Sequence, residues 1–127
     1  MALAETVADV LSAVMSVEAE DDGALTLRHD GTVALLRVVT IADGLEMVSL
    51  TQMLAWDLTA DSELVKRVVT LGQATMLGSI ILAEQPEGNA DVMLRYNFPA
   101  GGLDGPALQT LILMVLAAGA TAREALC

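Results

Sequence analysis

Cysteine and histidine are almost missing from this chain of 127 residues. The only cysteine is Cys127, so no disulfide can form within the chain and no cluster of Cys and His ligands can hold a metal. The only imidazole is His29, beside Asp30 in a predicted hairpin turn, and we expect an exposed turn residue there rather than a catalytic base. We therefore expect a protein that is not an enzyme and that needs no metal and no cofactor.

Basic residues are also scarce, with 6 Lys and Arg against 17 Asp and Glu, which gives a formal net charge of −11. This charge repels phosphate backbones and anionic bilayers, so we expect no nucleic-acid partner and no membrane partner. The N-terminal segment carries acids where a secretory signal carries basic residues, which favours a cytoplasmic protein. The apolar segment Pro106–Ala122 falls short of the roughly 20 residues of a membrane span, and we expect it in the core or at a subunit interface.

Two segments have some features of ion sites. The acidic run at 18–22 lacks the alternating ligand positions and the distant bidentate Glu of a calcium loop, so we interpret it as a solvated turn. The glycines of Gly101–Gly105 precede a helix as in an anion cradle, but Asp104 puts a negative charge where a phosphate would bind, and no Lys follows. Neither segment predicts a ligand site.

Aromatic residues make up only 2% of the chain, so the core must be built from aliphatic side chains and methionine. Apolar residues at spacings of three and four predict helices at 3–15, with a stop near residue 17, at about 62–78 after a cap at Asp61 or Ser62, and from Pro106 to about Leu126. Period-two alternation predicts strands at 24–28, 33–41, 45–55, 79–83 and 90–98. The pairs Asp30-Gly31 and Asp43-Gly44 predict tight turns between the first three strands.

The resulting order is α-β-β-β-α-β-β-α. It predicts an α+β sandwich in which helices pack on a five-stranded antiparallel sheet, with the last helix mostly buried. We expect one domain that spans residues 1–127.

One stretch resembles a known family. The segment Asp91-Val-Met-Leu-Arg-Tyr-Asn-Phe-Pro-Ala-Gly-Gly-Leu-Asp-Gly-Pro-Ala-Leu is similar to the last strand, Gly-containing loop and final helix of the type III secretion chaperones and the related YbjN-type proteins, a bacterial group. The element order, size and acidity resemble this superfamily over nearly the whole chain. The resemblance implies a cytoplasmic homodimer that binds extended segments of other proteins without ATP or metal, as a chaperone or as a regulator.

Both faces of the predicted sheet carry large apolar side chains, whereas the helices can cover only one. An uncovered apolar face usually marks a subunit interface or a partner site. We expect a homodimer, formed by the sheet or by the last helix, and a protein-binding surface on the helix-free face. The acidic surface should steer basic or unfolded partners, with an affinity that falls with added salt. The alternatives are an enzyme and a small-molecule-binding or sensory-transduction regulator without chaperone activity. The candidate binding residues are Leu35, Val39, Val48, Leu50 and Met93.

Overall fold

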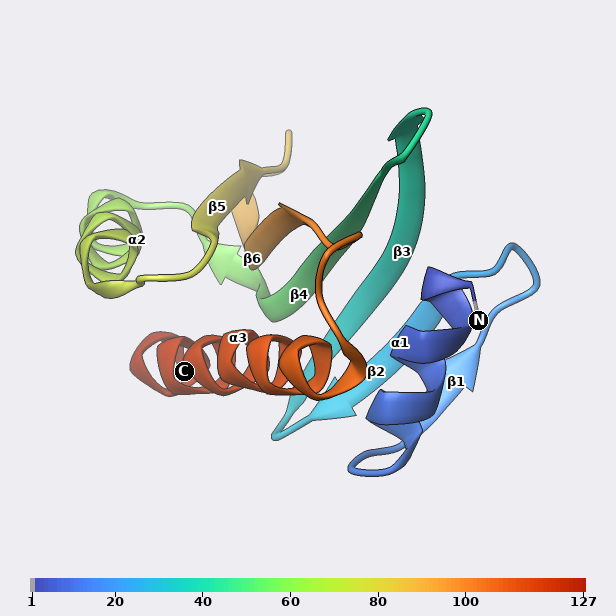
Figure 1. Cartoon of the computed structure of the whole chain (residues 1–127). Coiled ribbons are helices and arrows are strands. Elements are labelled where there is room, and N and C mark those ends of the chain that lie inside the picture. The colour runs from blue at the N-terminus through green and yellow to red at the C-terminus, as the bar shows by residue number, and fades with distance from the viewer. Residues whose placement is uncertain (1) are drawn as a thin grey trace.

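Nine elements follow one another along residues 2–127, the part of the chain that the computed structural model describes (Figure 1). They are α1 (Leu3–Ser12), β1 (Val17–Ala19), β2 (Leu25–His29), β3 (Thr32–Ala42), β4 (Leu45–Thr59), α2 (Ser62–Ala74), β5 (Ser79–Glu84), β6 (Asn89–Pro99) and α3 (Gly105–Leu126).

The strands form one antiparallel sheet in the order β1-β2-β3-β4-β6-β5. Two Asp-Gly turns connect β2, β3 and β4, and each uses backbone of positive φ: 44° at Asp30, 81° at Gly31 and 77° at Gly44. Such dihedral angles match the twist of a tight hairpin. The predicted α+β architecture, with an antiparallel sheet and three helices, is confirmed.

The sheet has six strands rather than the five predicted, because part of the acidic run is a strand. β1 pairs with β2 through Val17↔Leu27, and α1 accordingly ends at Ser12 rather than near residue 17. The carboxylate of Glu18 lies 3.7 Å from the guanidinium of Arg28. This ion pair joins β1 to β2 at the edge of the sheet. The sequence alone predicted only a solvated turn for the acidic run.

Two aspartates begin the longer helices. Asp61 accepts a hydrogen bond from the Leu64 backbone N–H at 2.9 Å, and Asp104 accepts one from the Ala107 N–H at the same distance. Each carboxylate satisfies an N–H that has no partner within its helix. Asp104 thus occupies the N-terminus of α3 itself, where an anion would otherwise bind.

The helices pack on one side of the sheet around a shared aliphatic core (Figure 1). α3 lies across β2, β3 and β4, with α1 beside it, and α2 packs on β5 and on α3. By length and composition alone α3 could cross a membrane, yet it packs here as a core helix with 39% of its most apolar 18-residue window buried. The expectation that this helix is mostly buried was therefore wrong, because the sheet, α1 and α2 together cover only part of its surface.

A polar side chain interrupts the core between β4 and α3. Gln52 is fully buried, and its Nε2 donates hydrogen bonds to Thr32 Oγ1 at 2.9 Å and to the Leu116 carbonyl at 3.0 Å. Its Oε1 occupies the space that a side chain at position 119 would fill, and the residue there is Gly119. Gln52 thus fixes the position of α3 relative to the sheet at this point.

Candidate protein-binding surface

Strand register assigns every side chain of the sheet to one of two faces. Leu36, Leu50 and Tyr96 align across β3, β4 and β6 on the helix side. The alternate positions form the opposite side, here called the open face, which no helix covers. Its members on β2 to β6 include Thr26, Arg28, Val33, Leu35, Arg37, Val39, Met47, Ser49, Thr51, Met53, Ser79, Ile81, Ala83, Asp91, Met93, Arg95, Asn97 and Pro99.

Three of the five predicted binding residues lie on the open face. Leu35 and Val39 are 38% and 39% exposed, and Met93 is half-buried. Val48 and Leu50 were assigned wrongly, because both are fully buried beneath the helices. β4 carries large apolar side chains at odd and even positions, so its sequence alone does not tell which set faces the helices.

Further apolar side chains, which the prediction omitted, complete this surface. Val33, Met53 and Ile81 align with Met93 across β3, β4, β6 and β5, and we call these four residues the apolar row. All four are half-buried. Met47 lies farther along β4 on the same face. Met47 and Met53 both lie at odd positions of β4, so the sequence already places them on one face of that strand. Which face this is depends on the register with the neighbouring strands.

The charge of the open face differs from that of the whole chain. Arg28, Arg37 and Arg95 lie on it, half of the chain's 6 basic residues. Arg28 pairs with Glu18 and Arg37 with Asp22, at 3.7 and 2.9 Å. Among residues 2–127, Arg95 has no such carboxylate partner. Asp91 of β6 also lies on this face, and its Oδ1 accepts a hydrogen bond from the Asp57 backbone N–H at 3.1 Å. With three arginines beside few carboxylates, this surface does not share the net charge of −11.

The Asp22 carboxylate is stabilised at the edge of the open face. It accepts a hydrogen bond from the Ala24 backbone N–H at 3.1 Å and pairs with the Arg37 guanidinium. The N–H first and the guanidinium second hold the pKa of Asp22 below its ordinary value. Asp22 is therefore ionised at neutral pH and neutralises Arg37.

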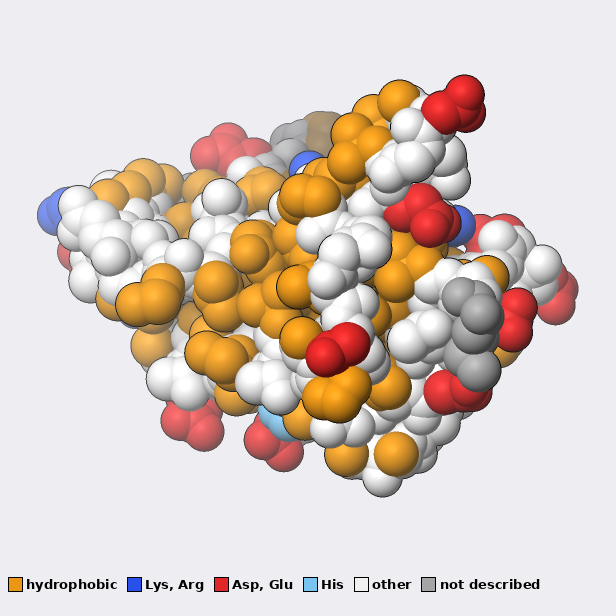
Figure 2. All heavy atoms as spheres, viewed as in Figure 1, with side chains coloured by type: hydrophobic (Ala, Val, Ile, Leu, Met, Phe, Trp, Pro, Cys, Tyr) orange, Lys and Arg blue, Asp and Glu red, His pale blue; other side chains and the backbone are white. Residues whose placement is uncertain are grey.

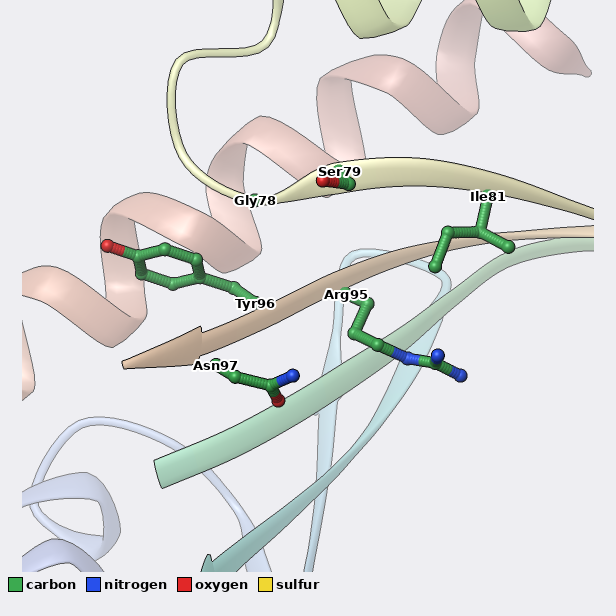
Figure 3. A pocket seen from close by; sticks show the side chains of 6 residues that line it. All are labelled: Gly78, Ser79, Ile81, Arg95, Tyr96 and Asn97. Atoms are coloured by element: carbon green, nitrogen blue, oxygen red, sulfur yellow. The ribbon is translucent and has the colours of Figure 1, made fainter. Parts of the chain in front are cut away.

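A shallow pocket of about 350 Å³ opens where β5 begins, beside the longer strand β6 (Figure 3). In this view the side chains of Ile81, Arg95 and Asn97 lie on one side of the strands, whereas Tyr96 points to the other side, toward α3. Gly78 (φ 85°) closes one end, and a Cβ there would lie 2.9 Å from the Arg95 carbonyl oxygen. The pocket thus joins the open face at Arg95.

The residues that could carry chemistry are engaged with neighbouring groups. His29 ends β2 rather than lying within the turn, its side chain is 25% exposed, and its Nε2 lies 3.6 Å from Asp30. In the acidic run, Glu20 accepts a hydrogen bond from Thr26, and Glu18 and Asp22 hold arginines. Within the described residues no group of three His, Cys, Asp or Glu side chains is placed to hold a metal.

Apolar side chains are also exposed outside the open face. Val65 and Val69 on α2 are 42% and 54% exposed, and Gly72 continues their side of the helix one turn on. We call these three residues the α2 stripe. Figure 2 shows further hydrophobic side chains over α3 and at the tip of the β3–β4 hairpin, with acidic side chains between them and at the edges of the view.

An antiparallel sheet with helices on one side, in this element order, is the fold class that the described residues define. The chain has the YbjN-type fold. It is similar to the crystal structure of YbjN from E. coli, described as a candidate transcription regulator, with a TM-score of 0.66, 14% sequence identity and coverage of 94% of this chain and 87% of that chain. No family model and no curated protein matches the sequence.

Proposed function

We propose that this protein is a non-enzymatic protein- or peptide-binding module, a chaperone-like or regulatory adaptor that works as a cytoplasmic homodimer. The observation that carries the proposal is the open face. Leu35 and Val39 are exposed there beside half-buried methionines, on a sheet whose other side already holds the core. A group of apolar side chains left uncovered by the fold is typical of a partner site.

The side chains of this face suit a partner of variable sequence. Met47, Met53 and Met93 are unbranched and adapt their shape to different neighbours. Burial of one large apolar side chain contributes on the order of 1.5–3 kcal/mol before ordering costs. A few such side chains are enough for micromolar affinity, roughly −8 kcal/mol.

The α2 stripe supports the homodimer. Val65 and Val69 lie one turn apart on α2, and nothing lies within 4 Å of a Cβ built at Gly72. A second copy could bring its own α2 close at this point, in the isologous contact of a two-fold dimer. Lys66 pairs with Glu63 beside the stripe, so the local charge does not oppose self-association.

Binding to a reduced and alkylated, permanently unfolded test protein examines the first part of the proposal. Leu35→Asp should weaken binding at least tenfold because it places a charge in the apolar contact, while circular dichroism shows an unchanged fold. Val65→Asp is the matched control, since it makes the same kind of change on α2. Unchanged binding by a folded Leu35→Asp variant would overturn the open face as the site.

Sedimentation equilibrium at micromolar concentration examines the dimer. The expected mass is that of two chains, and Val69→Asp should give one chain with its partner binding retained. A monomer mass for the wild-type protein at all concentrations contradicts this part of the proposal.

A small-molecule-binding regulator without chaperone activity is the second candidate. The pocket beside Arg95 favours it, because about 350 Å³ can take a small anion or metabolite, and YbjN is described as a candidate transcription regulator. A thermal-shift screen separates the two candidates. Metabolites that raise the melting temperature favour the regulator, whereas a response only to polypeptide favours the binding module.

A further inference from the structure

Arg95 is an unpaired cation beside the apolar row. The carboxylates that neutralise Arg28 and Arg37 come from the β1 strand and the turn after it, at the opposite edge of the sheet. The one side-chain hydrogen bond of the Arg95 guanidinium among the described residues runs from Nη2 to the Met93 sulfur at 3.9 Å, and sulfur is a weak acceptor. The guanidinium can therefore take a carboxylate that the chain does not supply.

The apolar row has the spacing of a helical ligand. Its four side chains lie on adjacent strands, and strands are about 4.8 Å apart. One turn of an α-helix rises about 5.4 Å, so a helix laid across the strands sets roughly one side chain over each strand. Amphipathic helices bind apolar grooves with this spacing of anchors.

We propose that the open face binds an amphipathic helix of another protein, whose apolar side rests on the apolar row and whose flanking Glu or Asp pairs with Arg95. This inference rests on the proposed function and names the chemistry of its partner. A second copy of this chain is the other occupant that the test must exclude, because its Asp91, two residues from Met93 on the same face of β6, would also bring a carboxylate to this surface.

The net charge of −11 repels an acidic partner at long range, so the test must isolate the local contact. At about 0.15 M salt the screening length is about 8 Å, and Arg95 then acts mainly on a group in contact with it. The probes are two dye-labelled helical peptides with the same leucine stripe, one flanked by Glu and the other by Lys. Their dissociation constants are measured by fluorescence anisotropy.

Arg95→Gln should weaken the Glu-flanked peptide about tenfold and leave the Lys-flanked peptide unchanged or slightly tighter. Arg67→Gln is the matched control, because it removes the same charge from α2, on the helix side, and should change neither affinity more than about twofold. Met93→Asp should weaken both peptides, since both rest on the apolar row.

The proposal is overturned if Arg95→Gln and Arg67→Gln have the same effect, or if Arg95→Gln weakens both peptides equally. It is also overturned if the wild-type protein is a dimer that Met93→Asp separates, because a second copy then occupies the face. If the unfolded test protein binds through Leu35 but neither peptide binds, this inference fails and the proposed function stands. If Leu35→Asp leaves binding of the unfolded protein intact, the proposed function fails.

Discussion

Replacement of Gly119 by alanine tests the close contact between Gln52 of β4 and Gly119 of α3. A Cβ at this position would lie 1.9 Å from Gln52 Oε1 and 2.4 Å from its Cδ. Atoms cannot approach so closely, so α3 must move away from β4 or the Gln52 side chain must turn. Either response disturbs the hydrogen bonds from Nε2 to Thr32 and to the Leu116 carbonyl.

The magnitude follows from opposing effects. Alanine is favoured over glycine inside a helix by about 1 kcal/mol. Overpacking of a core costs about 1–3 kcal/mol, and each buried polar group that loses its partner costs about 1–3 kcal/mol. Gln52 is fully buried, so water cannot replace the lost partners. We expect Gly119→Ala to lower the free energy of unfolding by about 2–4 kcal/mol.

Urea unfolding followed by circular dichroism measures the effect. Gly72→Ala, measured in the monomeric Val69→Asp background, is the matched control, because a Cβ added at this exposed helical glycine would have nothing within 4 Å in the single chain, and the change should raise the free energy of unfolding by about 0.5–1 kcal/mol. In a Gln52→Ala background, Gly119→Ala should lose most of its cost, since the collision is gone. A Gly119→Ala protein as stable as wild type would refute the reasoning.

Two further predictions concern a strand start and an edge carboxylate. Gly78→Ala should destabilise the fold by about 1–3 kcal/mol more than Gly88→Ala in urea unfolding, because both have positive φ but only a Cβ at 78 meets a backbone oxygen, at 2.9 Å; equal losses would contradict this. An NMR titration should give Asp22 a pKa below its ordinary value, owing to the Ala24 N–H and then Arg37, and Arg37→Gln should raise that pKa. Since a lowered pKa stabilises the fold above the unfolded-state pKa, this contribution should vanish as the pH falls below about 4, and a titration unaffected by Arg37→Gln would exclude the ion pair.

Local sequence signals predicted most of the fold. The Asp-Gly pairs, the cap at Asp61 and the change from helical to strand period each act over a few residues, and the structure follows them. β1 escaped prediction because its three residues are too few to show an alternation, and Glu18 reaches Arg28 only after β1 has paired with β2. Edge pairing of this kind leaves no mark on the local sequence.

The candidate surface was only partly predicted, and the reason is again that strand pairing is not visible in the sequence. In β3 the sequence placed Leu35 and Val39 on one face, and the structure confirms that placement. In β4 the buried face contains the polar Gln52 between apolar neighbours, so simple alternation does not identify it. The register with β3 and β6 decides the face, and register becomes visible only when the strands are paired.

The central claim is that the open face, and not the helix side, binds other polypeptides. Methyl NMR of the methionines tests it directly, because Met47, Met53 and Met93 lie on the open face, whereas Met76 is exposed just after α2 and Met114 on the outer side of α3. The protein, labelled at its methionine methyl groups, is titrated with the unfolded test protein. The account predicts shifts or broadening at the three open-face methyls, with the Met76 and Met114 signals unchanged. Changes confined to Met76 and Met114 would contradict it.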